Sequence, residues 1–232
     1  GCAPDLRSTS GLTGGSAYKM SQVSKSGKSL TGSLLSGALY RALAVSELNA
    51  SMGRIVAAPT AGSCGILPAA LLTMQEEREI PERDCVMALF TASAVGIVIA
   101  NNASLAGAQG GCQAECGSAA AMAAAAVTEL AGGTPAMISH AVAIALKNIL
   151  GLVCDPVGGL VEVPCQKRNA TAASVAFVSA QIALSGVQNL ISFDEAVAVM
   201  DEVGRGLPPE LRETALGGIA KAPSACAFCA GC

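Results

Sequence analysis

The chain has 232 residues, and 52% of them are apolar, which is enough for the buried core of one large domain. Small side chains dominate that apolar content, since aromatic residues reach only 3% and Trp is absent. The net charge is −3, the pI is near 5.2, and the fourteen Lys and Arg residues are scattered along the chain. No basic surface of the kind that binds nucleic acid is therefore expected.

The mean hydropathy of +0.53 raises the question of a membrane span. The most apolar stretch is Cys85 to Ala100, which contains Thr and Ser and runs into Asn101-Asn102. A membrane-spanning helix needs ~20 mostly apolar residues, so this shorter stretch favours a buried core helix and no membrane contact. The chain opens at Gly1 rather than Met, which leaves open whether an N-terminal segment precedes it.

Helical spacing of apolar residues recurs along the chain, and turns rich in Gly and Pro separate the helical segments. The predicted helices cover residues 30–50, 68–79, 81–100, 113–131, 135–150, 171–184, 192–203 and 208–216. No stretch alternates apolar and polar residues with a period of two. We therefore expect an all-α fold, a compact bundle of seven to eight helices rich in small residues, formed by residues 1–232 as one domain.

Residues 1–28 are polar and rich in Gly, Ser and Thr, and they are expected to form a loop. This loop is either a terminal arm or, because it leads into a helix, an anion site built from backbone N–H groups. A second loop of small residues precedes the helix that Pro68 begins. It is either a plain helix connection or another anion-binding or metal-facing loop.

Ten cysteines are present, and most of them are grouped. Cys154 and Cys165 enclose a Gly-Gly turn in CDPVGGLVEVPCQKRNA, and we interpret this stretch as a metal-binding loop, although the spacing does not specify the metal. Cys112 lies at the predicted start of an Ala-rich helix, where the helix dipole lowers the pKa of a thiol. Cys116, one turn later, is expected to point the same way. The only histidine, His140, is interpreted as a packed or surface residue rather than a catalyst.

Three motifs together carry a resemblance to a known family: PTAGSCGILPA from Pro59, GGCQAECGSAAAMAAAA from Gly110, and CDPVGGLVEVPCQKRNA from Cys154. With STSGLTGG, SGKSLTG and ELNASMGRI, they resemble the α chain of the iron–sulfur-dependent L-serine dehydratases over nearly the whole chain. The resemblance implies a [4Fe–4S] cluster held by Cys112, Cys154 and Cys165, with one iron left open as a Lewis acid for the serine hydroxyl. It implies the conversion of L-serine to pyruvate and ammonia, as part of cytoplasmic amino-acid degradation and gluconeogenesis.

The resemblance also suggests partners, namely a β chain or β domain that completes the site and further copies in an oligomer. We expect the general base to come from outside this sequence or from a missing N-terminal segment. The relatives carry a Glu-His pair before Cys154 where this chain has Lys147-Asn148, which puts any role taken over for that position in doubt. Side chains and N–H groups suited to the serine carboxylate are Ser10, Thr13, Gly14, Lys28, Thr60, Gly62, Ser63, Lys167, Arg168 and Asn169.

The C-terminal stretch CAFCAGC can be interpreted in two ways. Its spacing echoes a ferredoxin cluster motif, but the chain stops before that motif is complete. The preferred hypothesis is that the tail, residues 217–232, reaches the site and that Cys232 caps the open iron until substrate displaces it. Cys64, Cys85 and Cys116 are interpreted as small core residues.

Three other functions remain as alternatives. The same kind of cluster supports L-cysteine desulfidation, in which sulfide leaves instead of hydroxide. A non-catalytic iron–sulfur module for electron transfer belongs to another class. A pyridoxal-phosphate dehydratase is disfavoured because the sequence shows no alternation of strands and helices.

Overall fold

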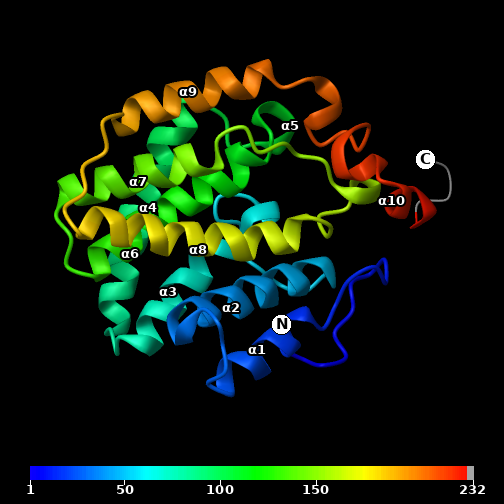
Figure 1. Ribbon diagram of the computed structural model, residues 1–232, viewed down its shortest axis with the longest axis horizontal. Helices are drawn as coiled ribbons and strands as arrows, with labels where there is room; N and C mark the ends of the chain where they lie inside the picture. The colour runs from blue at the N-terminus through cyan, green and yellow to red at the C-terminus, as the bar shows by residue number, and fades with distance from the viewer. Residues whose placement is uncertain (229–232) are drawn as a thin grey trace.

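The structure is a computed structural model, and it describes residues 1–228. Within these residues all regular secondary structure is helical, apart from one isolated parallel bridge between Cys154 and Arg212 (Figure 1). The all-α prediction is confirmed. The α-helices are α1 (Ser16–Lys25), α2 (Gly32–Ala50), α3 (Ile66–Glu77), α4 (Glu82–Asn102), α5 (Gly107–Gly110), α6 (Ser118–Leu130), α7 (Pro135–Ile149), α8 (Cys165–Leu184), α9 (Phe193–Gly206) and α10 (Pro223–Phe228).

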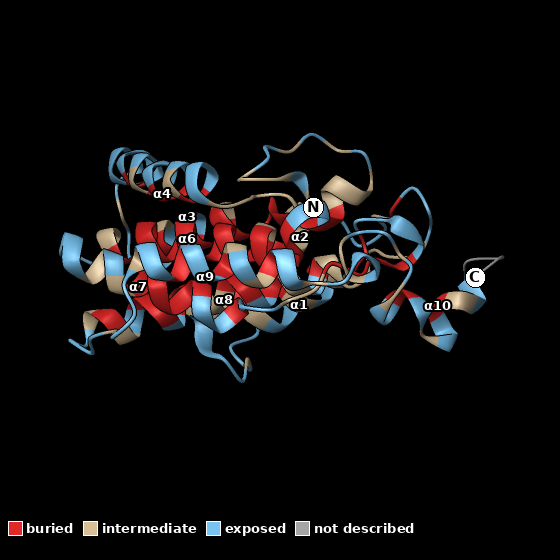
Figure 2. Cartoon of the chain, turned by 90° about the horizontal axis from the view of Figure 1, so that it is seen from above, coloured by how far each residue is buried: buried red, intermediate tan, exposed pale blue. Residues whose placement is uncertain are grey.

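Helix α6 forms the centre of the bundle. Every residue from Ser118 to Thr128 is buried, and the helix packs against α3, α4, α7 and α8 (Figure 2). A helix that is apolar on all sides belongs in a core, and its alanines let four neighbouring helices approach closely. Alanine rather than aromatic side chains fills this core, in agreement with the low aromatic content of the sequence.

Three predictions of helix boundaries were wrong. Residues 16–25, expected as loop, form α1, whose first N–H groups are capped by the buried Glu47 carboxylate from α2. Helix α8 begins at Cys165 rather than at residue 171, so the QKRN patch is helical. The last predicted helix, 208–216, is only a 3₁₀ turn at Pro209–Leu211, because the backbone of Glu213 and Ala215 turns to positive φ.

Helix α4 is less buried than the sequence suggested. It is long and apolar enough to cross a membrane, and only a third of its most apolar window, 33%, is buried (Figure 2). Its inner face, with Ala88, Ala92 and Ile99, packs on the core, whereas Phe90 and Ile97 are exposed. The prediction of a buried core helix therefore holds for one face only.

One end of the bundle, on the right in Figure 1, carries the N-terminal loop, the loop before α8 and the segment after α9. Hydrogen bonds join the N-terminal loop to the loop before α8, the 60–65 loop to α8, and the start of α6 to the segment after α7. The segment after α9 is joined to the same region, because the Cys154 N–H donates to the Leu211 carbonyl at 2.8 Å. Segments far apart in the sequence therefore meet at this end.

Candidate active site

Three cysteines reach the loop end of the bundle from separate segments. Cys112 lies directly before a π-helical turn, Gln113–Gly117, that leads into α6. Cys154 lies in the extended segment after α7, and Cys165 is the first residue of α8. Such π-helical turns often occur at functional sites. Here the Gln113 side chain holds the turn in place, because it accepts from the Gly151 N–H and donates to the Met200 carbonyl, both at 2.8 Å.

The three thiols influence one another electrostatically. Burial raises the pKa of Cys154, and the neighbouring Cys112 and Cys165 raise it further. Burial, followed by Cys112, raises the pKa of Cys165 to about 12. Cys112 differs, because a hydrogen bond from Cys116 lowers its pKa against the effect of burial, and the Arg168 guanidinium lowers it further. Cys112 is therefore the thiol that ionises most readily.

Cys116 lies beside Cys112, with 3.4 Å between the two sulfur atoms. Cys116 is buried, as are Cys64 and Cys85, in agreement with the prediction that these three are core residues. The hydrogen bond between the two thiols also raises the pKa of Cys116 well above its usual range, so Cys116 stays protonated. It supports the Cys112 thiolate.

Cys112, Cys154 and Cys165 are candidate ligands for an iron–sulfur cluster. All three are free thiols, and within residues 1–228 no three His, Cys, Asp or Glu side chains converge closely enough to hold one ion. In an iron–sulfur cluster each thiolate binds a different iron, so the ligands stand further apart. Gly107 packs tightly against them, because a Cβ there would lie only 3.0 Å from the Cys154 sulfur. The three thiols fit the donor set of the cluster that the resemblance implies.

Arg168 connects two of the cysteine segments from the first turn of α8. Its guanidinium donates to the Val153 carbonyl at 2.8 Å and forms an ion pair of 2.9 Å with the buried Asp155. Burial alone would lower the pKa of Arg168, but the negative charges of Cys112 and Asp155 outweigh it and the pKa rises. Arg168 thus stays charged and places a positive charge beside Cys112.

Asn169 fixes the 60–65 loop against α8. Its amide nitrogen donates to the carbonyls of Gly62 (2.7 Å) and Cys165 (2.9 Å), and its oxygen accepts from the Gly65 N–H at 3.0 Å. Both amide hydrogens are therefore already engaged by the backbone. The geometry gives Asn169 a structural role in positioning Gly62 next to the cysteines.

Glu115 is a carboxylate that the sequence interpretation missed. It projects from the π-helical turn, and its Oε1 accepts from the Thr60 hydroxyl at 3.0 Å. A Cβ at Gly62 would lie 3.1 Å from Oε1, and one at Gly107 would lie 2.8 Å from Oε2. Burial raises the pKa of Glu115 above its usual range, the Thr60 hydrogen bond opposes that rise, and the charge of Glu213 adds to it. Its position within GGCQAECG, three residues after Cys112, was the signal available in the sequence.

The N-terminal loop is bound to the site through a second carboxylate that was missed. Glu162 is buried and accepts from the hydroxyls of Ser10 (2.8 Å) and Thr13 (2.7 Å). Gln166 donates to the same Thr13 oxygen at 2.8 Å. These hydroxyl protons already point at a carboxylate, so in this arrangement they orient the loop rather than face a second anion. Gly14 follows in a left-handed conformation (φ 145°), against the Leu6 carbonyl.

Nearly the whole chain matches one protein family. The family model described as "Serine dehydratase alpha chain" matches residues 1–220. The chain belongs to the serine dehydratase alpha chain family. It is 52% identical over 219 residues to a probable L-serine dehydratase alpha chain from Bacillus subtilis, a match that covers 94% of this chain and 73% of that one. It is 50% identical over 206 residues to the L-serine dehydratase alpha chain of Peptoniphilus asaccharolyticus, covering 89% and 70%.

Longer members of the family also match. The L-serine dehydratase TdcG of Escherichia coli is 45% identical over 181 residues, which are 77% of this chain but only 40% of that protein. The sequence resemblance to serine dehydratase α chains is thereby confirmed. The three cysteine segments and the 60–65 loop all lie inside the region that matches the family model.

Several predicted site residues do not join this cluster. Lys28 lies in the exposed turn between α1 and α2, where its backbone N–H donates to the Ser26 hydroxyl, and Lys167 is exposed on α8. His140 lies on α7 and accepts a hydrogen bond from the Asn189 N–H, in keeping with its interpretation as a packed residue. Ser63 is buried and hydrogen-bonds the Thr60 hydroxyl at 3.0 Å, shaping the loop that carries Gly62. Cys232, the predicted fourth ligand, lies outside the described residues.

The segment after α9 covers the Cys154 loop. The Glu213 N–H donates to the Cys154 carbonyl at 2.7 Å, and the Ile219 N–H donates to Asp155 at 2.7 Å. Gly218 is required there, because its φ is 60° and a Cβ would lie 2.3 Å from the Asp155 carboxylate. Asp155 therefore joins Arg168 on one side to the C-terminal segment on the other.

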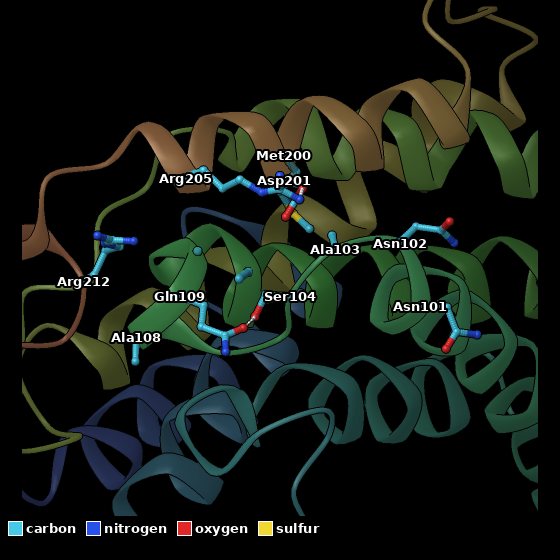
Figure 3. A pocket seen from close by; sticks show the side chains of 12 residues that line it. Asn101, Asn102, Ala103, Ser104, Ala108, Gln109, Met200, Asp201, Arg205 and Arg212 are labelled. Carbon is cyan, nitrogen blue, oxygen red and sulfur yellow. Dashed lines mark hydrogen bonds and ion pairs between the residues drawn. The ribbon is translucent and has the colours of Figure 1, made fainter.

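A separate polar cavity of about 500 Å³ lies between the end of α4, α5 and α9 (Figure 3). Figure 3 shows Gln109 turned toward Ser104, with a hydrogen bond of 2.7 Å, and Arg205 turned toward Asp201. None of Cys112, Cys154 and Cys165 lines this cavity. Two of its lining residues adjoin the cysteine segments, because Gly110 lies two residues before Cys112 and Arg212 is bridged to Cys154.

Proposed function

We propose that this chain is the cluster-binding part of an L-serine dehydratase that converts L-serine to pyruvate and ammonia. The family match over residues 1–220 carries the proposal, since relatives of about 50% identity bear that name. L-Serine would lose its α-proton and its hydroxyl group as water, giving 2-aminoacrylate. This tautomerises to an imine, which water hydrolyses to pyruvate and ammonia.

The proposed cofactor is a [4Fe–4S] cluster on Cys112, Cys154 and Cys165. Three free thiols that influence one another electrostatically support it, as does the glycine at position 107, where a side chain would press on the Cys154 sulfur. When bound, a cluster with one iron free of protein ligands supplies a Lewis acid for the departing hydroxyl group.

Three side chains of this chain would position the parts of the site. Arg168 keeps a positive charge beside Cys112, and Asn169 holds the Gly62 segment against the site. Glu162 binds the N-terminal loop to the segment between Cys154 and Cys165. These contacts would enclose a small polar substrate between four chain segments and limit its access to water.

A β chain is proposed as partner, together with a cytoplasmic location, an oligomeric enzyme and a role in serine degradation that feeds gluconeogenesis. Relatives called alpha chains, and a longer E. coli relative of which this chain spans 40%, support the partner. The general base is assigned to that partner. The capping of the open iron by Cys232 is also a proposal, and the attachment of the C-terminal segment at Asp155 supports it.

The test is a product assay on protein purified without oxygen, with and without the β chain of the same source. L-Serine, L-threonine and L-cysteine are supplied in turn, and pyruvate, 2-oxobutanoate, ammonia and sulfide are measured. The proposal expects pyruvate and ammonia from L-serine at the highest kcat/KM. Sulfide release from L-cysteine as the preferred reaction would instead establish a desulfidase. A cluster that shows no spectral response to any of the three amino acids would establish a non-catalytic module.

A further inference from the structure

Glu115 is an acidic side chain near the three cysteines, and its charge raises the pKa of both Cys154 and Cys165. Thr60 donates to one of its carboxylate oxygens, Oε1. Its second oxygen, Oε2, faces the backbone at Gly107, the same glycine that approaches the Cys154 sulfur. Glu115 is thus placed beside Cys154, and no hydrogen-bond donor to Oε2 is seen within residues 1–228.

The charge of this carboxylate is not balanced within residues 1–228. No Lys, Arg or His in this range forms an ion pair with Glu115, and the charged group that acts on it most strongly is another carboxylate, Glu213. The nearby cation, Arg168, is already paired with Asp155. A largely buried carboxylate without a counter-charge is unfavourable, and a cationic group placed next to it relieves that cost.

The substrate class of the proposed function carries one such cation. An α-amino acid has an ammonium group, which donates up to three hydrogen bonds and pairs with a carboxylate oxygen. We propose that Glu115 binds the α-ammonium group of the substrate through Oε2, while Thr60 fixes the carboxylate through Oε1. This inference rests on the proposed function and makes Glu115 the residue that selects amino acids over the corresponding hydroxy acids.

The test compares two ligands that differ only in the amino group, L-serine and 3-hydroxypropanoate. Both are titrated into the anaerobic holoenzyme, and binding is read from the change in the cluster's visible and EPR spectra. Wild type is compared with Glu115→Gln, with Glu115→Asp, which keeps the charge, and with Glu202→Gln, an exposed carboxylate on α9. Iron content is measured for each variant before titration.

In wild type, L-serine should bind at least about tenfold more tightly than 3-hydroxypropanoate, as expected for a hydrogen bond between charged groups. Glu115→Gln should remove that preference by weakening L-serine alone, Glu115→Asp should keep part of it, and Glu202→Gln should keep it all. The proposal is overturned if the preference is absent in wild type, if it persists in Glu115→Gln, or if Glu115→Gln loses iron. Failure of the proposed function would look different, because wild type would then form no pyruvate from L-serine.

Discussion

Replacing Asn169 by alanine tests how the site is held together. The side chain is fully buried and makes three hydrogen bonds, two of them to backbone groups of the 60–65 loop. Asn169→Ala leaves the Gly62 carbonyl and the Gly65 N–H without these partners. A buried backbone group that loses its hydrogen bond costs about 1–3 kcal/mol, so the two together should lower the free energy of unfolding by about 2–6 kcal/mol.

The assay is equilibrium unfolding in urea, followed by far-ultraviolet circular dichroism. Thr171→Ala is the matched control, because Thr171 lies two residues further along α8 and is exposed, with a single hydrogen bond to the Lys167 carbonyl. The control should change stability by less than about 0.5 kcal/mol. A loss below about 1 kcal/mol for Asn169→Ala would refute the inference that this amide joins the loop to the helix.

Three further substitutions test separate parts of the site. Gly107→Ala should reduce iron content after anaerobic reconstitution, because its Cβ would lie within 3.0 Å of the Glu115 carboxylate and the Cys154 sulfur. The control Gly206→Ala, which has open space around it, should keep its iron, and equal iron content in the two variants would contradict this prediction. Glu162→Gln should speed amide hydrogen exchange in residues 8–14, because it weakens the hydrogen bonds that hold this loop, whereas the Glu202→Gln control should not. Unchanged exchange would mean that contacts other than those of Glu162 hold the loop. In the metal-free chain, burial raises the pKa of Glu115, so its stabilising contribution is complete below its unfolded-state pKa and is lost as pH rises through the folded-state pKa. Glu115→Gln should therefore gain stability relative to wild type in thermal unfolding as pH rises above the ordinary glutamate pKa of about 4.5, and a constant difference would argue against it.

Much of the fold followed from the sequence because helical spacing is a local signal. The Ala-rich segment was expected to be helical, and its burial on all sides is what such a composition requires. Helix α1 was missed because Glu47, some thirty residues away, supplies the cap for its first N–H groups. The start of α8 was misplaced because the Pro and Gly residues of the preceding loop concealed that Cys165 is already helical.

The candidate site followed from the sequence only where its residues carried a recognisable motif. The three cysteines belong to two such motifs, and the structure brings the 154–165 loop together with Cys112 from another segment. The roles of Ser10 and Thr13 were not predictable, because their partner Glu162 is about 150 positions away and looks like an ordinary loop residue. Glu115 was missed because acidic residues are common at helix starts.

The central claim is that Cys112, Cys154 and Cys165 together hold one cluster, and its most direct test is the iron and acid-labile sulfide content of the chain reconstituted without oxygen. Wild type should contain about four of each per chain, the composition of a [4Fe–4S] cluster. Each of the three cysteines changed singly to serine should lower both contents sharply, whereas Cys85→Ala, a buried cysteine on α4, should retain them. Full iron and sulfide in any one of the three serine variants would contradict the account.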